Sequence, residues 1–156
     1  MIIRLKTPEI MIGAYVANMR VIQNYKQNYD QGPHTIKNLW SYHIEGALGE
    51  MAVAKHLNLY WSGNIGDREA PDVGPYQVKC NTSRTHDDCI LRPINPNGIY
   101  ISVLCFTPDF EICGWIDSAD AKIDTYWRAP VKERPAWFFP RDLLNPMDTL
   151  PELPWP

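Results

Sequence analysis

Apolar residues recur at helical spacing in two stretches near the start of the chain. Separations of four and three positions predict a helix over residues 7–27, with one apolar stripe that packs against the rest of the protein. A second helix is predicted over residues 41–58, which carry small and apolar residues at helical spacing. The stripe of the first helix comprises Met11, Tyr15, Met19 and Ile22.

Strand-like patterns follow the second helix. Residues 99–107 are nearly all apolar, as in a central strand that is buried on both faces. Together with residues 111–116 they predict a hairpin around Pro108 and Asp109. Shorter strands are predicted at residues 58–62, 76–80 and 88–92.

The end of the chain has a different character. Residues 117–121 predict a short helix, and from about residue 125 the sequence is rich in Pro and Trp. We expect this last segment to wrap the core irregularly and to end in a helical turn near Leu143. At 156 residues the chain predicts a single domain, 1–156, of the α/β class, with a central mixed sheet of four or five strands flanked by helices.

The stretch PDVGPYQVK places polar side chains around a turn. Gly74 and Pro75 mark the turn, and residues 76–80 then alternate as a strand does. Alternate side chains of a strand share a face, so Gln77 and Lys79 point together while their neighbours face the core. The sequence therefore predicts an amide and an ammonium group directed to the region that Asp72 reaches across the turn.

A carboxylate on the second helix adds to this group. At 100° per residue, Glu50 shares a face with Gly46, Ala47 and apolar residues. Burying a carboxylate without a partner is costly, so Glu50 requires a metal ion, a basic side chain or backbone amides. The small residues Gly46 and Ala47 are expected to let this helix approach the sheet closely.

The order of these residues resembles the PD-(D/E)XK nuclease superfamily, in its QXK variant. Gly46 to Glu50, with Leu57 seven residues later, is similar to the GxxGExxxxxxL setting of the helix glutamate in that superfamily. Asp72 and then Gln77-Val78-Lys79 follow in the superfamily order. The resemblance covers about residues 44–79 and implies the restriction-endonuclease-like fold.

This resemblance implies a nuclease that uses Mg²⁺ or Mn²⁺ to hydrolyse phosphodiester bonds, with DNA as the expected substrate. Asp72 and Glu50 would hold the ion, together with the side-chain oxygen of Gln77 and the Val78 carbonyl. Lys79 would orient or deprotonate the attacking water and stabilise charge on the phosphate. Gln77 stands where the commoner motif has an acidic residue, and a neutral ligand weakens a cation site.

Further residues could support such a site. Asp67, Glu69 or Glu45 could supply an additional carboxylate, and each also suits a solvated position. The polar residues after the motif strand could contact a phosphate backbone, or form an ordinary loop. These possible contacts are Thr82, Ser83 and Arg84.

Two other functions remain open. The chain could be a nucleic-acid-binding or phage-type accessory protein that keeps the nuclease fold without cutting. The motif could also be accidental, in an interaction module. The six tryptophans suggest stacking on single strands, but core or oligomer contacts are the better explanation without a basic groove. A homodimer is an option, because many such nucleases dimerise to cut two strands.

Composition limits the compartment and the ligands. The net charge of −3 argues against a generally basic nucleic-acid-binding surface, although local phosphate contacts are compatible with it. We see neither a membrane-spanning apolar run nor the plan of a signal peptide, so we expect a cytoplasmic protein without membrane partners. The cysteines form no CxxC pair, so we expect free thiols without metal. They are Cys80, Cys89, Cys105 and Cys113.

Overall fold

The computed structural model describes residues 1–26, 36–67, 69–82, 88–130 and 134–154. Its long helices are α1 (Thr7–Lys26) and α2 (Ile36–Leu57). The strands are β1 (Ile2–Arg4), β2 (Gln77–Asn81), β3 (Asp88–Leu91), β4 (Ile99–Phe106), β5 (Asp109–Asp117), β6 (Trp127–Arg128) and β7 (Ala136–Pro140). Short helical turns occur at α3 (Ser118–Ala121), Asp124–Tyr126, Arg141–Leu143 and Met147–Thr149.

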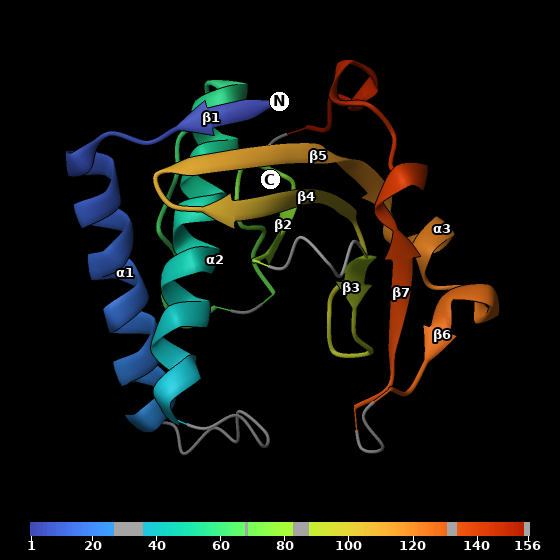
Figure 1. Ribbon diagram of the computed structural model, residues 1–156, viewed down its shortest axis with the longest axis horizontal. Helices are drawn as coiled ribbons and strands as arrows, with labels where there is room; N and C mark the ends of the chain where they lie inside the picture. The colour runs from blue at the N-terminus through green and yellow to red at the C-terminus, as the bar shows by residue number, and fades with distance from the viewer. Residues whose placement is uncertain (27–35, 68, 83–87, 131–133, 155–156) are drawn as a thin grey trace.

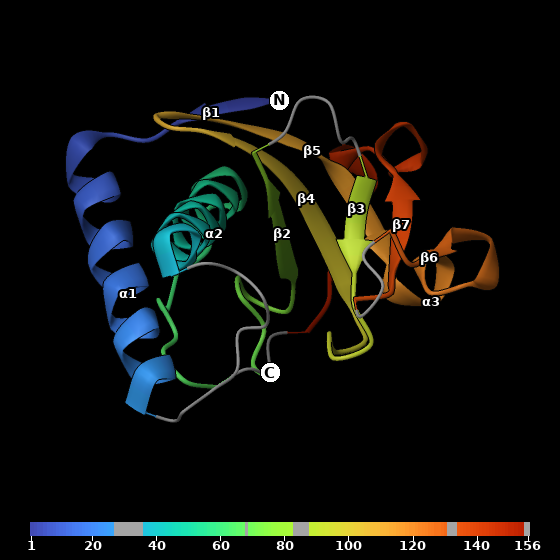
Figure 2. The ribbon, with the colours of Figure 1, turned by 60° about the horizontal axis from the view of Figure 1, so that its bottom comes forward.

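A four-stranded mixed sheet in the order β1-β5-β4-β2 lies at the centre of the fold. The helices α1 and α2 lie on one side of it, and a three-stranded sheet in the order β3-β7-β6 lies on the other (Figures 1 and 2). Strand β2 runs parallel to β4, whereas the other pairs of the central sheet are antiparallel. The α/β class with a central mixed sheet is therefore confirmed. Because β2 is an edge strand, it pairs with β4 on one side only.

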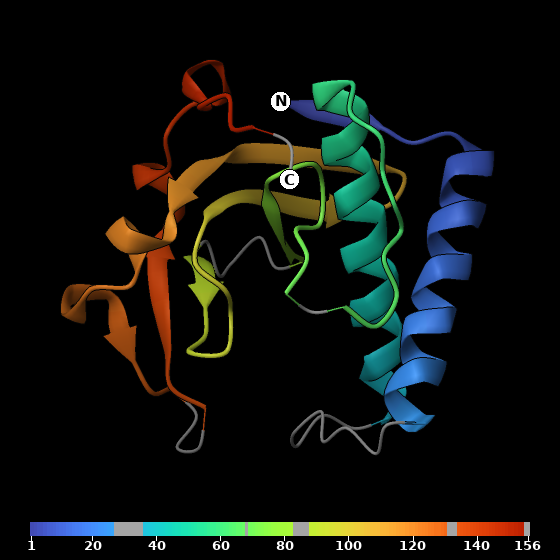
Figure 3. The ribbon, with the colours of Figure 1, turned by 180° about the vertical axis from the view of Figure 1, so that it is seen from behind.

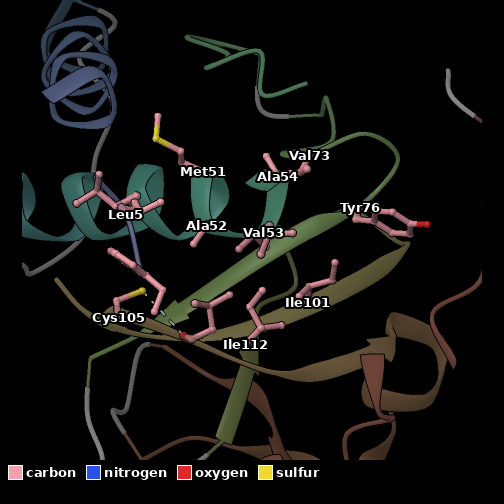
Figure 4. Close-up of a cluster of buried hydrophobic side chains, with 14 of the residues drawn as sticks. Leu5, Met51, Ala52, Val53, Ala54, Val73, Tyr76, Ile101, Cys105 and Ile112 are labelled. Atoms are coloured by element: carbon pink, nitrogen blue, oxygen red, sulfur yellow. Dashed lines mark hydrogen bonds between the residues drawn. The ribbon is translucent and has the colours of Figure 1, made fainter. Parts of the chain in front are cut away.

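The main core lies between α2 and the central sheet (Figure 4). Strand β4 is buried at every position except Phe106, as its apolar sequence predicts. The helix approaches closely at Gly49, where a Cβ atom would lie only 2.1 Å from the Cys80 Sγ atom. Gly46, which we expected to allow this approach, has nothing within 4 Å of the position of a Cβ atom. The close packing therefore depends on Gly49.

Helix α1 turns a different face inward from the one its apolar stripe predicts. Met11, Tyr15 and Ile22 are exposed, and the buried residues are Gly13, Ala17 and Val21. This correction has a steric reason, since Gly13 lies against Leu48 of α2 and a Cβ there would be 2.5 Å from a Leu48 methyl carbon. Two closely packed helices favour small residues at the contact over large apolar ones.

Residues 58–62 do not form the predicted strand. Asn58 adopts a positive φ of 53°, and the Leu59 N–H donates to the Ala54 carbonyl at 2.9 Å, which ends α2. The chain then runs back alongside the helices, as the view from behind shows (Figure 3). Gly63 lies against Val16 of α1, so helix contacts rather than strand pairing hold this segment.

The C-terminal third is more regular than its composition predicts. The hairpin of β4 and β5 and the short helix α3 are confirmed, and Asp117 caps α3 by accepting the Ala119 N–H. The helical turn at Arg141–Leu143 is confirmed as well. Strand β7, however, was predicted as irregular chain, and β3 pairs with it rather than with the central sheet. A second small core of six buried residues lies beneath this sheet: Cys89, Leu91, Tyr100, Ile116, Ala121 and Phe139.

All four cysteines have free thiols. Cys80 and Cys105 lie on neighbouring strands against α2, where the hydrogen-bond contact with Cys105 and then burial raise the pKa of Cys80. Their Sγ atoms contact the carbonyl oxygens of Gly46 and Glu45 at 3.8 and 3.7 Å. None of the helices in the described part of the chain is long and apolar enough to cross a bilayer.

Candidate functional site

A tight turn fixes Asp72 at the open edge of β2. The N–H groups of Asp72 and Val73 both donate to the Tyr76 carbonyl at 3.0 Å, and Gly74 supplies the positive φ of 54° that this turn requires. The Asp72 Oδ2 atom then accepts the Val78 N–H at 2.8 Å. Asp72 thus reaches across the turn, as the sequence predicts, and takes the bond that a further strand would otherwise make.

The alternation of β2 directs Gln77 and Lys79 away from the α2 core. Val78 is buried against that core, whereas Gln77 and Lys79 are half-buried on the opposite face. The N–H and C=O groups of one strand residue point to the same side. Because the Val78 N–H points to Asp72, the Val78 carbonyl also opens on the free edge of the sheet.

Glu50 has a basic partner within the protein. Its exposed fraction is 6%, and its carboxylate accepts hydrogen bonds from Arg20 Nη1 at 2.6 Å and Nη2 at 2.8 Å. The indole N–H of Trp61 donates to the same carboxylate at 3.0 Å. Arg20 is itself held by a 2.9 Å bond from its Nε to the Asn64 carbonyl. The pair therefore joins α1, α2 and the segment that follows α2.

The residues of the motif meet in one cavity of about 400 Å³. Its lining includes side chains from α1, α2 and β2 and from the turn before β2. Every residue that the sequence assigns to the metal site or to catalysis is among them: Glu50, Asp72, Gln77, Val78 and Lys79. Arg20 and Asp67 line it as well. The structure therefore brings together residues up to 29 positions apart in the sequence, from Glu50 to Lys79.

Burial and charge together raise the pKa of Asp72 to about 7. Loss of hydration is the largest cause, and the negative charge of Glu50 adds to it. The Val78 N–H and the positive charges of Lys79 and Arg20 oppose this shift. A nearby cation would favour the ionised form of Asp72.

Lys79 lines the same cavity. Burial lowers its pKa, while the charge of Asp72 opposes the shift. Its Nζ atom lies 5.5 Å from the centre of the Tyr100 ring. Among the described residues, no carboxylate forms a salt bridge with it. A half-buried lysine whose ammonium group forms no salt bridge can bind a phosphate.

The oxygen donors suit Mg²⁺ or Mn²⁺, which prefer hard oxygen ligands. Asp72 Oδ2 is bonded to Val78, and no donor among the described residues contacts Oδ1. A carboxylate offers about four acceptor sites. Three of those on Glu50 are taken by Arg20 and Trp61, which leaves one on Oε1. The described residues contain no cluster of three His, Cys, Asp or Glu side chains that could hold an ion, so amide and backbone oxygens would have to complete the site.

The additional carboxylates contribute unequally. Asp67 lines the cavity, but its Oδ1 atom accepts the N–H groups of Glu69 and Ala70 at 3.0 and 3.1 Å and so holds the local loop. Glu69 is exposed and does not line the cavity. Burial raises the pKa of Glu45, which lies on another face of α2 and is likewise outside the cavity.

Of the suggested phosphate contacts, only Thr82 can be placed. It is exposed directly after β2. Ser83 and Arg84 lie outside the described residues.

Sequence reasoning missed Arg20 and Trp61, the two partners of Glu50. The helical pattern of α1 draws attention to its large apolar residues, and Arg20 lies beside the buried Val21 rather than on that stripe. A signal was present, because Glu50 on an apolar face requires a partner. The sequence does not say which of the 15 Lys and Arg residues provides it.

No protein-family model, curated protein or solved structure matches this chain.

Proposed function

We propose that the protein is a metal-dependent nuclease with a restriction-endonuclease-like fold, and that DNA is its substrate. The observation that carries the proposal is the shared cavity in which Asp72, with a pKa of about 7, lies near Lys79, whose ammonium group forms no salt bridge among the described residues. In such a pair the carboxylate of Asp72 can bind a divalent ion while the ammonium group of Lys79 binds the phosphodiester.

Asp72, the Gln77 side-chain oxygen and the Val78 carbonyl would hold the ion, and Glu50 would add its remaining acceptor site. When bound, a divalent cation supplies Lewis-acid chemistry and lowers the pKa of water. Arg20 limits the negative charge of the cavity by neutralising Glu50. The site therefore depends strongly on Asp72, because Glu50 is already paired with Arg20 and Asp67 holds its local loop.

Lys79 would act on the phosphate and on the attacking water. Its ammonium form stabilises negative charge on the phosphoryl oxygens, and its lowered pKa lets the Nζ atom take up a proton from water. Hydrolysis adds the oxygen of that water to phosphorus while one ester bond breaks and the leaving oxygen gains a proton. Tyr100 and the neighbouring strand hold Lys79 in position for this role.

A second candidate function is nucleic-acid binding without cleavage. The Arg20–Glu50 pair favours it, because an arginine already occupies the cationic position beside the helix glutamate. In that case the four charged groups balance one another without a metal ion. They are Arg20, Glu50, Asp72 and Lys79.

A metal titration separates these functions. We expect Mg²⁺ or Mn²⁺ at about 100 times the dissociation constant to add about 2.7 kcal/mol, which raises the Tm by about 5–10 °C. Asp72→Asn should abolish the shift, whereas Asp142→Asn, an exposed carboxylate far along the chain, should leave it unchanged. No shift in the wild type would contradict the metal site. A shift that survives Asp72→Asn would place the ion elsewhere.

A further inference from the structure

A second, larger cavity adjoins the candidate site. Its volume is about 1020 Å³, and its lining comes from α2, from β2, β3, β4, β6 and β7, and from the segments between them. Three residues line both cavities, namely His43, Lys79 and Asn95. A ligand that fills the larger cavity would therefore reach Lys79 and the residues beside it. Figure 2 shows β2 between α2 and the smaller sheet.

The described lining of this cavity is basic, although the whole chain has a net charge of −3. Four Lys and Arg side chains line it against one carboxylate, Asp88. Asp88 lies 3.9 Å from an Arg128 nitrogen, in a pair that is partly exposed. The cationic lining comprises Lys79, Arg92, Arg128 and Arg134. Such a local concentration of positive charge attracts an extended anion.

Arg92 lacks an anionic partner in the part of the chain that the structure describes. Burial lowers its pKa, and repulsion from Arg134 lowers it further. Two arginines that approach each other in a partly buried wall are stabilised when a phosphate binds between them. A bound phosphate would also stabilise the ammonium group of Lys79, which lies where the two cavities meet.

Apolar and aromatic side chains also line the cavity, beside polar residues such as Asn81 and Ser102. Leu39 and Tyr42 of α2 face it from one side, and Ile90 and Phe138 of the small sheet face it from the other. Aromatic rings beside a basic groove suit a single strand, because its unpaired bases can stack on the rings while its phosphates meet the arginines. A duplex keeps its bases paired inside the helix, so it can use the arginines but not this apolar wall.

We propose that this cavity, defined by Tyr42, Lys79, Arg92 and Phe138, binds single-stranded DNA and leads it to the candidate site. The statement that the bound strand is a substrate rests on the proposed nuclease function, whereas the statement that the cavity binds the strand does not. It assigns the substrate class as a single strand or a single-stranded end or flap rather than uninterrupted duplex.

Fluorescence anisotropy with the full chain in EDTA tests this assignment without any cleavage. The probes are a labelled single strand of mixed sequence and the same sequence in a duplex. We expect the single strand to bind more tightly. Arg92→Ala should weaken that binding about fivefold at 0.1 M salt and reduce the salt slope by about 0.7. Tyr42→Leu should weaken it at least about fivefold through lost stacking.

Matched controls lie outside the cavity. Arg4→Ala removes an exposed arginine on β1, at the opposite edge of the central sheet from β2, and Tyr60→Leu removes an exposed tyrosine. Both should bind the strand as the wild type does. Equal affinity for duplex and single strand, or cavity variants that match these controls, would overturn the inference. Single-strand binding without metal-dependent cleavage would support the inference and contradict the proposed function. Metal-dependent cleavage without a preference for single strands would support the proposed function and contradict the inference.

Discussion

At the scale of single residues, the contact between Arg20 and Glu50 determines how much negative charge the cavity offers. The two side chains are 17% and 8% exposed, so the pair is largely buried. A buried pair is weak evidence of stabilisation, but removing one partner leaves a costly uncompensated charge. The pair also explains how Glu50 can lie on an apolar helix face without a metal ion.

We expect Arg20→Met to destabilise the protein by about 3–5 kcal/mol, because it leaves the Glu50 carboxylate buried without its cation. Urea unfolding at neutral pH measures this loss. The double variant Arg20→Met/Glu50→Gln should recover much of it, because the stranded charge is then absent.

Arg4→Met is the matched control, because the Arg4–Asp109 pair is exposed and should contribute less than about 1 kcal/mol. A similar small loss for Arg20→Met would show that the buried pair does not hold the cavity together. If the free energy of unfolding of the double variant were lower than that of Arg20→Met, Glu50 would not be the unpaired buried charge that destabilises the single variant.

The pKa of Asp72 gives a prediction with a defined pH window. A carboxyl group whose pKa rises from 3.8 to about 7 on folding contributes stability below its unfolded pKa, and this contribution is lost as the pH rises through about 7. Asp72→Asn removes the charge. In EDTA the variant should therefore have a higher Tm than the wild type at pH 8, and this advantage should shrink as the pH falls to 5.

Thermal unfolding in EDTA at several pH values measures this difference, with Asp142→Asn as the exposed control. A constant difference between Asp72→Asn and the wild type from pH 5 to 8 would show that Asp72 titrates normally. A lower Tm for Asp72→Asn at pH 8 would mean that its ionised form is already stabilised by the protein.

At the scale of elements, α2 contains a matched pair of glycines. A Cβ at Gly49 would overlap the Cys80 sulfur, whereas a Cβ at Gly46 would meet nothing within 4 Å. We expect Gly49→Ala to cost about 1–3 kcal/mol through overpacking between α2 and β2. Gly46→Ala should stabilise by about 0.5–1 kcal/mol through helix propensity. Equal effects of the two variants in urea unfolding would contradict the close approach of α2 at Gly49.

Local patterns predict the elements well where one periodicity dominates. The hairpin of β4 and β5 follows from an apolar run and a Pro-containing turn, and the short helix α3 lies within the predicted residues 117–121. Residues 58–62 have a strand-like composition, but the left-handed Asn58 returns the chain along the helices. Strand β7 was not predicted because its Pro-rich surroundings obscure the strand propensity of Trp137, Phe138 and Phe139, and its partner β3 is distant in sequence.

At the scale of the whole molecule, the residues of the site fall into two groups: some are close together in the sequence, and others are far apart in it. Asp72, Gln77 and Lys79 lie within eight consecutive residues, so one turn and one strand bring them together. Arg20 lies on α1 and reaches Glu50 only because the two helices pack side by side. Helix packing of this kind depends on the whole fold, which a single sequence does not reveal.

The charge of the larger cavity differs in sign from the net charge of the whole chain. The net charge of −3 gave no support for nucleic-acid binding, yet the larger cavity collects four cationic side chains from β2, β6 and the segments after β3 and before β7. These residues span 55 positions of the sequence, from Lys79 through Arg92 and Arg128 to Arg134. Only the fold brings them to one wall.

The central claim is that the cavity around Asp72 and Lys79 hydrolyses phosphodiester bonds with a divalent ion. Its most direct test is cleavage of supercoiled plasmid, branched DNA and single strands in Mg²⁺ or Mn²⁺, with EDTA as the control. The wild type should cut at least one substrate, and Asp72→Asn and Lys79→Ala should each lose cleavage. Only Asp72→Asn should also lose metal binding, because a cationic side chain cannot ligate Mg²⁺. Cleavage that survives both substitutions, or no cleavage by wild-type protein with a bound ion, would contradict the claim.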